Sequence, residues 1–319
     1  MFLLLRRRHA AVWGAHQLKF DVAFCADSNM EAPLHVAASS LLARTGEGWT
    51  VVFHLLLPDF DEARRAKLCR TLDLVQRPYE ARFLPAPPES MFAGFRPLHG
   101  NKMAYYRLAL PDLIDAERLL YVDSDTITFT DVAPLAHLDM AHWAAGFVPR
   151  SRVGYYPERA FYARLGLRPE TPGLNSGVML FNLPEWRAQN WTERIFQFCR
   201  KYPNDLVAAD QTALIATFAG RFAPLDQRYN VHLFSYSAAE DPAQLPGIYH
   251  FVGSPKPWDL GGSWIHPAYS LYREGLSATV FKENRNGFRS LANWQRAYRI
   301  RGGYYRTLRN RISGSLEKS

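Results

Sequence analysis

The stretch RLLYVDSDTITF, residues 118–129, decides the fold class, because an apolar run ends there in two closely spaced carboxylates. Residues 118–122 have the character of a buried strand. In an extended segment, residues two apart point to the same side, so Asp123 and Asp125 project together. Two carboxylates this close repel each other unless a proton or a cation lies between them. The pattern therefore indicates a site for a hard divalent cation with oxygen ligands.

The Asp-x-Asp pattern is also compatible with two alternatives to a metal site. The two acids can be solvated loop residues or caps of the following turn. They also suit a phosphohydrolase of the haloacid dehalogenase type, in which the first Asp is the nucleophile. That pattern continues with Thr or Val where this chain has Ile127, and it needs a later acidic pair. The nearest candidate, AAEDPAQ at 238–244, follows no apolar strand.

Outward from this strand, apolar segments alternate with segments of helical periodicity. The pattern predicts strands at 20–27, 49–57, 81–86 and 176–183, and helices at 29–45, 61–73, 101–114 and 184–202. Such alternation is typical of an α/β domain with a mainly parallel sheet. With no clear linker before about residue 280, we expect one catalytic domain at 20–281, flanked by a leader at 1–19 and a C-terminal segment at 282–319.

Composition limits the class of protein. The chain has 319 residues, of which 48% are hydrophobic and 21% charged, which is ordinary for a globular protein with a large core. No stretch approaches the roughly 18 apolar residues of a membrane span. The start, MFLLLRRRHA, places its short apolar run before the arginines, which argues against a secretion signal. Three widely spaced cysteines suggest small buried side chains in a reducing cytosol.

The net charge of +8 is concentrated at the C-terminus. Residues 282–319 hold ten basic residues against two acidic ones, which equals the net charge of the whole chain. Aromatic residues such as Trp294, Tyr298 and Tyr305 are interleaved with the arginines. This composition suits an anionic membrane surface, reached through residues 282–311. No nucleic-acid motif accompanies it, so no nucleic-acid partner is expected. A folded helix with a solvated basic face is the open alternative.

Polar residues of three further segments point to ligand binding. In YHFVGSPKPWDLGG (249–262), His250 follows an apolar run and is a candidate third metal ligand. Gly253 allows close backbone approach, and Lys256 offers a point charge for a phosphate. In GLNSGVMLFNL (173–183), Asn175 and Ser176 precede a strand and suit sugar hydroxyls. In AADQTALI (208–215), Asp210 and Gln211 begin a predicted helix, where capping by Asp is the open alternative.

These segments together resemble glycosyltransferase family 8, and within it the bacterial lipopolysaccharide galactosyltransferases and glucosyltransferases. The resemblance covers roughly residues 20 to 260. It is carried, in the family's order, by FCADSN (24–29), YYRLALPDLI (105–114), YVDSDTI (121–127), LNSGVMLFNL (174–183), ADQTAL (209–214) and HFVGSPKPW (250–258). It implies a glycosyltransferase A fold, a single Rossmann-like nucleotide-binding domain with a mixed central sheet. It also implies metal-dependent, retaining transfer of galactose or glucose from a UDP-sugar.

The same resemblance implies roles for individual residues. Asp123, Asp125 and His250 would bind Mn²⁺ or Mg²⁺, with Ser124 between the two acids. Lys256 and Gly253 would meet the diphosphate, and Asp27 and Asn29 the uridine and ribose. The donor sugar would be surrounded by Arg107, Asn175, Ser176, Asp210 and Gln211, of which Gln211, Asp210 and Asn175 are the candidate catalytic residues. We expect departure and attack on the same face of the sugar rather than a covalent intermediate.

The chain departs from the family pattern at three places. Ser28 and Thr212 stand where the family often has an acid. After the metal motif, Arg150 and Arg152 occupy a segment in which an acid near the acceptor is expected. Both arginines can be solvated surface residues, or they can serve an acceptor that carries phosphate or carboxylate.

The resemblance further suggests a lipopolysaccharide or other surface-glycan acceptor and a peripheral position on the inner face of the plasma membrane. A non-catalytic protein that binds a membrane surface or nucleic acid is the alternative outside the enzymes. In that case the function would survive Asp123→Ala and depend on the charge of residues 282–311.

Overall fold

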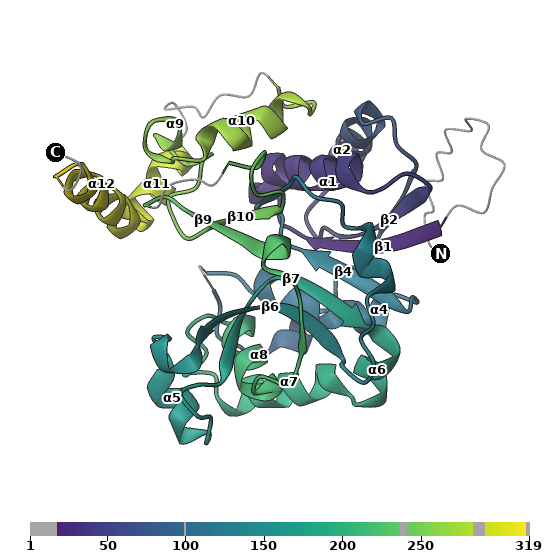
Figure 1. Cartoon of the computed structure of the whole chain (residues 1–319), viewed down its shortest axis with the longest axis vertical. Coiled ribbons are helices and arrows are strands. Elements are labelled where there is room, and N and C mark those ends of the chain that lie inside the picture. The colour runs from purple at the N-terminus through teal and green to yellow at the C-terminus, as the bar shows by residue number, and fades with distance from the viewer. Residues whose placement is uncertain (1–17, 99, 237–240, 283–290, 317–319) are drawn as a thin grey trace.

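A seven-stranded mixed sheet forms the centre of the molecule in the computed structural model, which describes residues 18–98, 100–236, 241–282 and 291–316 (Figure 1). The spatial order is β3-β2-β1-β4-β7-β6-β8. Neighbours among the first four strands run parallel, whereas β7 is antiparallel to β4 and β6. The strands are β1 Leu18–Cys25, β2 Trp49–Leu56, β3 Tyr79–Phe83, β4 Arg118–Val122, β6 Ala145–Arg152, β7 Pro172–Asn182 and β8 Ala223–Pro224.

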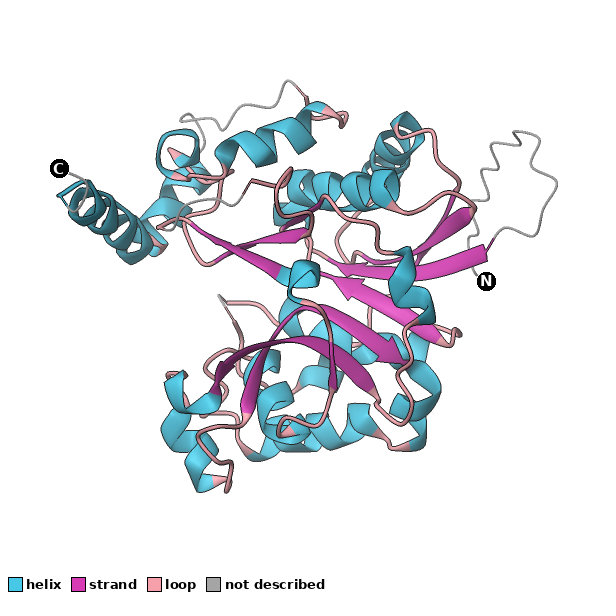
Figure 2. Ribbon diagram, in the orientation of Figure 1, coloured by secondary structure: helices cyan, strands magenta, loops and turns pink. Residues whose placement is uncertain are grey.

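Helices cover both faces of this sheet, which explains why its central strands are apolar at nearly every position (Figure 2). Along β4, Leu119 and Tyr121 enter one hydrophobic core, and Leu120 and Val122 enter the core on the opposite face. The first core is covered by α6 Leu183–Ala188, α7 Trp191–Lys201 and α8 Asp210–Phe218, and the second by α1 Glu31–Arg44 and α2 Glu62–Leu74. The α/β class with a mixed central sheet, expected from the sequence, is confirmed.

A second, three-stranded sheet begins directly after the Asp-x-Asp segment. It consists of β5 Thr126–Thr128, β10 Ile248–Val252 and β9 Val231–Phe234, with β10 antiparallel to β5 and parallel to β9. His250 pairs in register with both Thr126 and His232. Helix α10 Tyr269–Ser277 packs on α1 and closes a third hydrophobic cluster over this sheet. The two aspartates therefore lie at the junction of two sheets.

Two helices predicted as continuous are interrupted. Residues 101–114 form α3 Met103–Tyr106, a 3₁₀ turn Arg107–Ala109 and α4 Leu110–Leu113. The ring of Pro111 would clash with the carbonyl of residue 107 in a regular α-helix, which accounts for the change. Residues 184–202 divide into α6 and α7 because Asn190 adopts a left-handed conformation with φ 52°, which Asn tolerates better than most residues.

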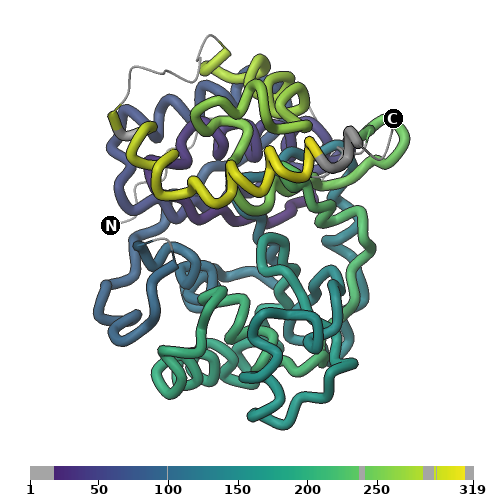
Figure 3. Tube along the Cα trace, turned by 90° about the vertical axis from the view of Figure 1, so that its left-hand side faces the viewer, coloured from purple at the N-terminus to yellow at the C-terminus, as the bar shows by residue number. Residues whose placement is uncertain are grey.

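The C-terminal segment forms α11 Leu291–Arg299 and α12 Arg301–Leu316, and α12 lies across the molecule beside the chain near residue 250 (Figure 3). The Thr307 hydroxyl hydrogen-bonds the Ser235 hydroxyl at 2.7 Å, and the Tyr304 hydroxyl donates to the carbonyl oxygen of Leu260 at 2.6 Å. The short helices α5 Arg159–Arg164 and α9 Gly262–Ile265 complete the fold.

No helix in the described part of the chain is long and apolar enough to cross a membrane. Of the predicted leader, residues 1–17 lie outside the described residues, and Leu18 and Lys19 belong to β1.

Candidate functional site

The turn after β4 holds the two aspartates in place through backbone hydrogen bonds. The Asp123 amide donates to the carbonyl oxygen of Gly177 at 2.7 Å, which continues the β4–β7 pairing beyond the end of β4. The Thr126 hydroxyl donates to the carbonyl oxygen of Asp123 at 2.9 Å, and Ser124 is buried between the two acids. The carboxylates therefore project from a fixed backbone at the edge where β4 ends.

Asp123, Asp125 and His250 come together as the sequence predicts. Each offers a ligand atom, and these atoms lie within 4.8 Å of one another. His250 Nε2 is 3.1 Å from Asp125 Oδ1 and 3.9 Å from Asp123 Oδ2. His250 Nδ1 hydrogen-bonds the amide oxygen of Asn230 at 3.1 Å, and an amide oxygen only accepts, so Nδ1 carries the proton. Nε2 is the nitrogen that faces the two aspartates, an arrangement typical of metal-binding histidines.

Gly177 leaves the space that this cluster occupies. A Cβ atom at Gly177 would lie 2.2 Å from His250 Cε1 and 2.9 Å from Asp123 Oδ2. Any larger residue would displace two of the three candidate ligands. A donor set of two carboxylates and an imidazole, with a backbone cleared for it, fits Mn²⁺ or a similar divalent cation.

Lys256 extends the cluster toward the loop that follows β10. Its Nζ lies 2.6 Å from Asp125 Oδ2 and also donates to the carbonyl oxygen of Phe251. Although burial raises the pKa of Asp125, Lys256 and His250 together hold it well below its usual range. In the same loop, Gly253 has φ 79°, a conformation that L side chains rarely adopt.

The C-terminal helices hold this loop from outside. The Lys256 amide donates to the buried carboxylate of Asp259 at 2.7 Å, and Arg296 Nη2 donates to the same oxygen at 3.2 Å. Burial lowers the pKa of Arg296, but Asp259 outweighs this effect and raises it, with a smaller contribution from Asp27. Arg296, a cation of the C-terminal segment, thus helps to hold the loop that carries Lys256.

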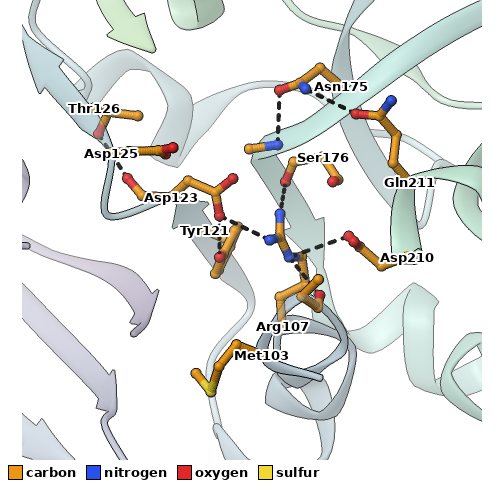
Figure 4. Close-up of polar contacts among 12 residues, drawn as sticks. Met103, Arg107, Tyr121, Asp123, Asp125, Thr126, Asn175, Ser176, Asp210 and Gln211 are labelled. Atoms are coloured by element: carbon orange, nitrogen blue, oxygen red, sulfur yellow. Dashed lines mark hydrogen bonds and ion pairs between the residues drawn. The ribbon is translucent and has the colours of Figure 1, made fainter. Parts of the chain in front are cut away.

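Arg107 joins the two halves of the site (Figure 4). The buried guanidinium lies 3.0 Å from Asp123 Oδ1 and 3.3 Å from Asp210 Oδ2, and Nη1 donates to the carbonyl oxygen of Ser176 at 2.5 Å. It also stacks over the Tyr121 ring, 4.6 Å from its centroid, and the Tyr121 hydroxyl donates to Asp123. Both carboxylates raise the pKa of Arg107 against the effect of burial.

Asp210 is fully buried at the first position of α8, so it is more than an exposed helix cap. Burial raises its pKa from the ordinary 3.8 to about 6, and Arg107 only partly offsets this. The preceding Ala209 has φ 50°, which a non-glycine residue adopts at a cost of order 1 kcal/mol. Thr212, where the family often has an acid, accepts from the Ala208 amide and donates to Glu158, which fixes the turn.

A chain of amides connects Gln211 to the metal cluster. Asn175 Nδ2 donates to Gln211 Oε1 at 2.9 Å, and Asn175 Oδ1 accepts from Asn230 Nδ2 at 2.9 Å. Asn230 then contacts His250 through its own oxygen. Since each amide is oriented by the next, Gln211, Asn175 and the candidate ligand His250 are positioned as one unit.

Asp27 and Asn29 lie beyond the end of β1, which is adjacent and parallel to β4. Asp27 accepts from the Asn29 amide at 3.1 Å and from Asn101 Nδ2 at 3.2 Å. Asp27, like Asp123, follows the carboxyl end of a strand, the edge at which open α/β sheets bind ligands. No described hydrogen bond links Asp27 directly to the metal cluster, so its role stays a prediction.

Two residues beside the cluster were not predicted from the sequence. Asn230 is the fully buried link between Asn175 and His250. The ring centroid of His232 lies 5.7 Å from that of His250. Both belong to RYNVHLF, a segment with no local pattern that marks a ligand site. Only the pairing of β9 with β10 brings them to the cluster.

The fold and this site define a glycosyltransferase of the A fold. The profile of glycosyl transferase family 8 matches residues 21–260. The chain belongs to this family.

Individual relatives agree with that assignment. General stress protein A of Bacillus subtilis is 28% identical over 80% of this chain and 92% of its own length. The lipopolysaccharide glucosyltransferase WaaO of Escherichia coli is 24% identical over 83% of this chain and 80% of its own length. Against glycosyltransferase GlyE of Streptococcus pneumoniae, the match covers 50% of this chain and 38% of that protein. The crystal structure of the galactosyltransferase LgtC with donor and acceptor sugar analogues superposes with a TM-score of 0.67 at 26% identity, over 82% of this chain and 96% of LgtC.

The haloacid dehalogenase alternative is not favoured. The family assignment explains the Asp-x-Asp segment, and the carboxylate of Asp123, which would be the nucleophile, is engaged by Arg107 and Tyr121.

The close approach at Gly177 yields a direct test of the metal cluster. We expect Gly177→Ala to weaken Mn²⁺ binding at least about tenfold, because the methyl group would displace His250 and Asp123. Mn²⁺ titration followed by electron paramagnetic resonance measures this. Gly302→Ala is the matched control, because a Cβ atom there meets nothing within 4 Å. Unchanged Mn²⁺ affinity in Gly177→Ala would count against the cluster as the metal site.

The raised pKa of Asp210 has a consequence for stability. Between about pH 4 and 6 the native state holds a proton that the unfolded state has lost, so this group's contribution to stability falls as the pH rises. At pH 7.5 Asp210→Asn should therefore raise the free energy of unfolding by about 2–3 kcal/mol, with Asp123 still pairing Arg107. The gain should shrink toward pH 4.5.

Denaturant unfolding at pH 4.5 and 7.5 measures this difference. Asp139→Asn, at an exposed carboxylate, is the control and should show no comparable pH dependence. A variant Asp210→Asn that is less stable than the wild type at pH 7.5 would show that the ion pair with Arg107 outweighs the cost of burying Asp210.

Proposed function

We propose that the chain transfers galactose or glucose from a UDP-sugar to a lipopolysaccharide or other surface-glycan acceptor, with retention of configuration and with Mn²⁺ or Mg²⁺ bound. The observation that carries the proposal is the convergence of Asp123, Asp125 and His250 beside the Asn175–Gln211 pair. WaaO and LgtC, a glucosyltransferase and a galactosyltransferase by name, support a hexose as the transferred group.

Donor binding divides between the two sheets. Asp123, Asp125 and His250 would hold the metal, which supplies Lewis-acid stabilisation of the leaving diphosphate when bound. Lys256, which contacts Asp125, would exchange that contact for a phosphate oxygen, and Gly253 would let the backbone approach the diphosphate. Asp27 and Asn29, at the end of β1, would contact the uridine and ribose. Ser124 and Ser176, both buried, would complete the set of donor-binding residues.

The surroundings of Asp210 support transfer on one face of the sugar. Its carboxylate is buried and paired with Arg107, so its charge serves to compensate the guanidinium. Gln211 is held by a hydrogen bond from Asn175 (Figure 4) and would lie against the donor sugar. Leaving-group departure and acceptor attack then proceed on the same face. A glycosyl-enzyme adduct detected by mass spectrometry would contradict this route.

Turnover of the donor tests the proposed activity. We expect one UDP-sugar of a panel to release UDP in the presence of Mn²⁺, and EDTA to abolish the release. Asp125→Asn should lower the rate at least about a hundredfold, because it removes a charged ligand and leaves Lys256 without its partner. A coupled assay for UDP measures the rate.

Asp139→Asn is the control for this experiment, because it removes one exposed carboxylate outside the site. If no sugar is turned over, calorimetric binding of UDP with Mn²⁺ provides the second readout. Release of UDP that survives both EDTA and Asp125→Asn would rule out the metal-dependent mechanism.

The exposed side of the C-terminal helices would dock on the anionic inner face of the membrane, which makes the protein cytoplasmic and peripheral. Large apolar and aromatic side chains are exposed on this segment, namely Trp294, Tyr298, Tyr305, Leu308 and Ile312. Arg299 and Arg306 are exposed beside them. Aromatic and cationic residues on one helix are typical of interfacial binding.

Charge reversal tests this docking without removing the helices. We expect the double variant Arg299→Glu and Arg306→Glu to bind phosphatidylglycerol vesicles at least about tenfold more weakly, because each cation near an anionic surface contributes about 1 kcal/mol. Vesicle co-sedimentation measures the binding. Arg159→Glu with Arg168→Glu, exposed at and after α5, makes the same charge change as a control. Equal binding by both double variants would contradict the proposed surface.

A further inference from the structure

A pocket lies beside the metal cluster, and none of the candidate donor-binding residues lines it. It encloses about 470 Å³, and Arg150, Asp226, Arg228 and His232 contribute to its lining. His232 connects it to the site, because β9 and β10 pair His232 with His250 and their ring centroids are 5.7 Å apart. Arg150 pairs in register with Gly173 on β7, two residues before Asn175. Two lining residues, His232 and Arg150, therefore lie next to strand positions that carry or flank candidate site residues.

The Arg150 side chain is partly buried, and two of its three guanidinium nitrogens lack a hydrogen-bond partner within the described part of the chain. Its Nε and Nη2 atoms are inaccessible to solvent and have no hydrogen-bond partner among the described residues. No carboxylate forms an ion pair with it within that part of the chain, and burial lowers its pKa, the direction expected for an uncompensated cation. Buried N–H groups without partners are costly, since they have lost their hydration and gained no hydrogen bond in return.

The other charges of the pocket compensate one another. Arg228 lies 3.2 Å from Asp226, and both side chains are about half exposed. The nearby Arg152, on the same strand as Arg150, is exposed to solvent. Arg152 is thus a solvated surface arginine, whereas Arg150 is partly buried. Since Arg228 is paired with Asp226, the charge of Arg150 is the one left uncompensated in the lining of the pocket.

We propose that this pocket binds the acceptor through an anionic substituent, a phosphate or a carboxylate, which pairs with Arg150. The inference rests on the proposed function, because it assigns the pocket to the acceptor of that same reaction. A planar guanidinium with two free N–H groups matches a bidentate oxyanion, which a lysine would hold only as a point charge. Nε and Nη2 are inaccessible to solvent in this conformation, so the guanidinium would turn into the pocket that Arg150 lines to pair with the anion. The bound anion would orient the acceptor sugar toward Gln211.

Calorimetry with simple sugars tests the pocket. The wild type is first saturated with UDP and Mn²⁺, so that Lys256 and the metal cluster are occupied, and is then titrated with glucose, glucose 6-phosphate or glucuronic acid. We expect at least one anionic sugar to bind at least about tenfold more tightly than glucose, and the stronger of the two identifies phosphate or carboxylate as the preferred group. In Arg150→Gln this ratio should fall to about one.

Arg152→Gln is the matched control, because it removes the same charge from the same strand at an exposed position, and it should keep the wild-type ratio. A wild type that does not distinguish anionic from neutral sugars, or a preference that survives Arg150→Gln, would overturn the anion pocket while UDP–Mn²⁺ binding remains intact. An equal loss of the preference for anionic sugars in Arg152→Gln would also overturn the anion pocket. Failure to bind UDP with Mn²⁺ would overturn the proposed function and the pocket with it.

Discussion

The buried guanidinium of Arg107 is the contact on which the site depends. It connects Asp123 after β4, the carbonyl oxygen of Ser176 on β7 and Asp210 at the start of α8. β4 and β7 are also paired as neighbouring strands, and Arg107 links α8 to both. A cation in this position needs counter-charges, because burial without them costs several kcal/mol. The same contact, together with the Tyr121 hydroxyl, orients the Asp123 carboxylate. Assembly of the sheet and assembly of the candidate metal site are therefore parts of one electrostatic arrangement.

A second constraint is the junction between the two sheets. β4 ends at Val122 and β5 begins at Thr126, so Asp123, Ser124 and Asp125 form the crossing. Since β10 lies against β5, His250 reaches the acids from the other sheet, and Asn230 fixes its ring from β9's side. Gly177 leaves the volume between them free. A metal bound there would connect the two sheets through its protein ligands. It would also connect the donor to the protein.

The elements that have a local pattern could be predicted from the sequence. The alternation of apolar and helical segments indicated the α/β class, and the family resemblance identified Asp123, Asp125 and His250, which the structure brings together. The breaks at Arg107–Ala109 and Asn190 were not predicted, because each depends on one residue's backbone conformation within an otherwise helical pattern. The sequence does not predict Asn230 and His232 as site residues, because the residues they contact come from β7 and β10, which are distant in sequence. Arg150 and Arg152 look equivalent in sequence, and only burial separates them.

Ion pairing distinguishes the cations of the C-terminal segment, which form one basic tract in the sequence. Arg296 pairs with Asp259, and the same carboxylate accepts from the amide of Lys256, whereas Arg299 and Arg306 are exposed and form no ion pair within the described residues. Thr307 and Tyr304 add hydrogen bonds to β9's end and to the loop at Leu260. Removal of the whole segment would thus disturb the Lys256 loop together with any membrane contact. The two roles are separable only by substitution of single residues, because residues of both sets lie on the same two helices.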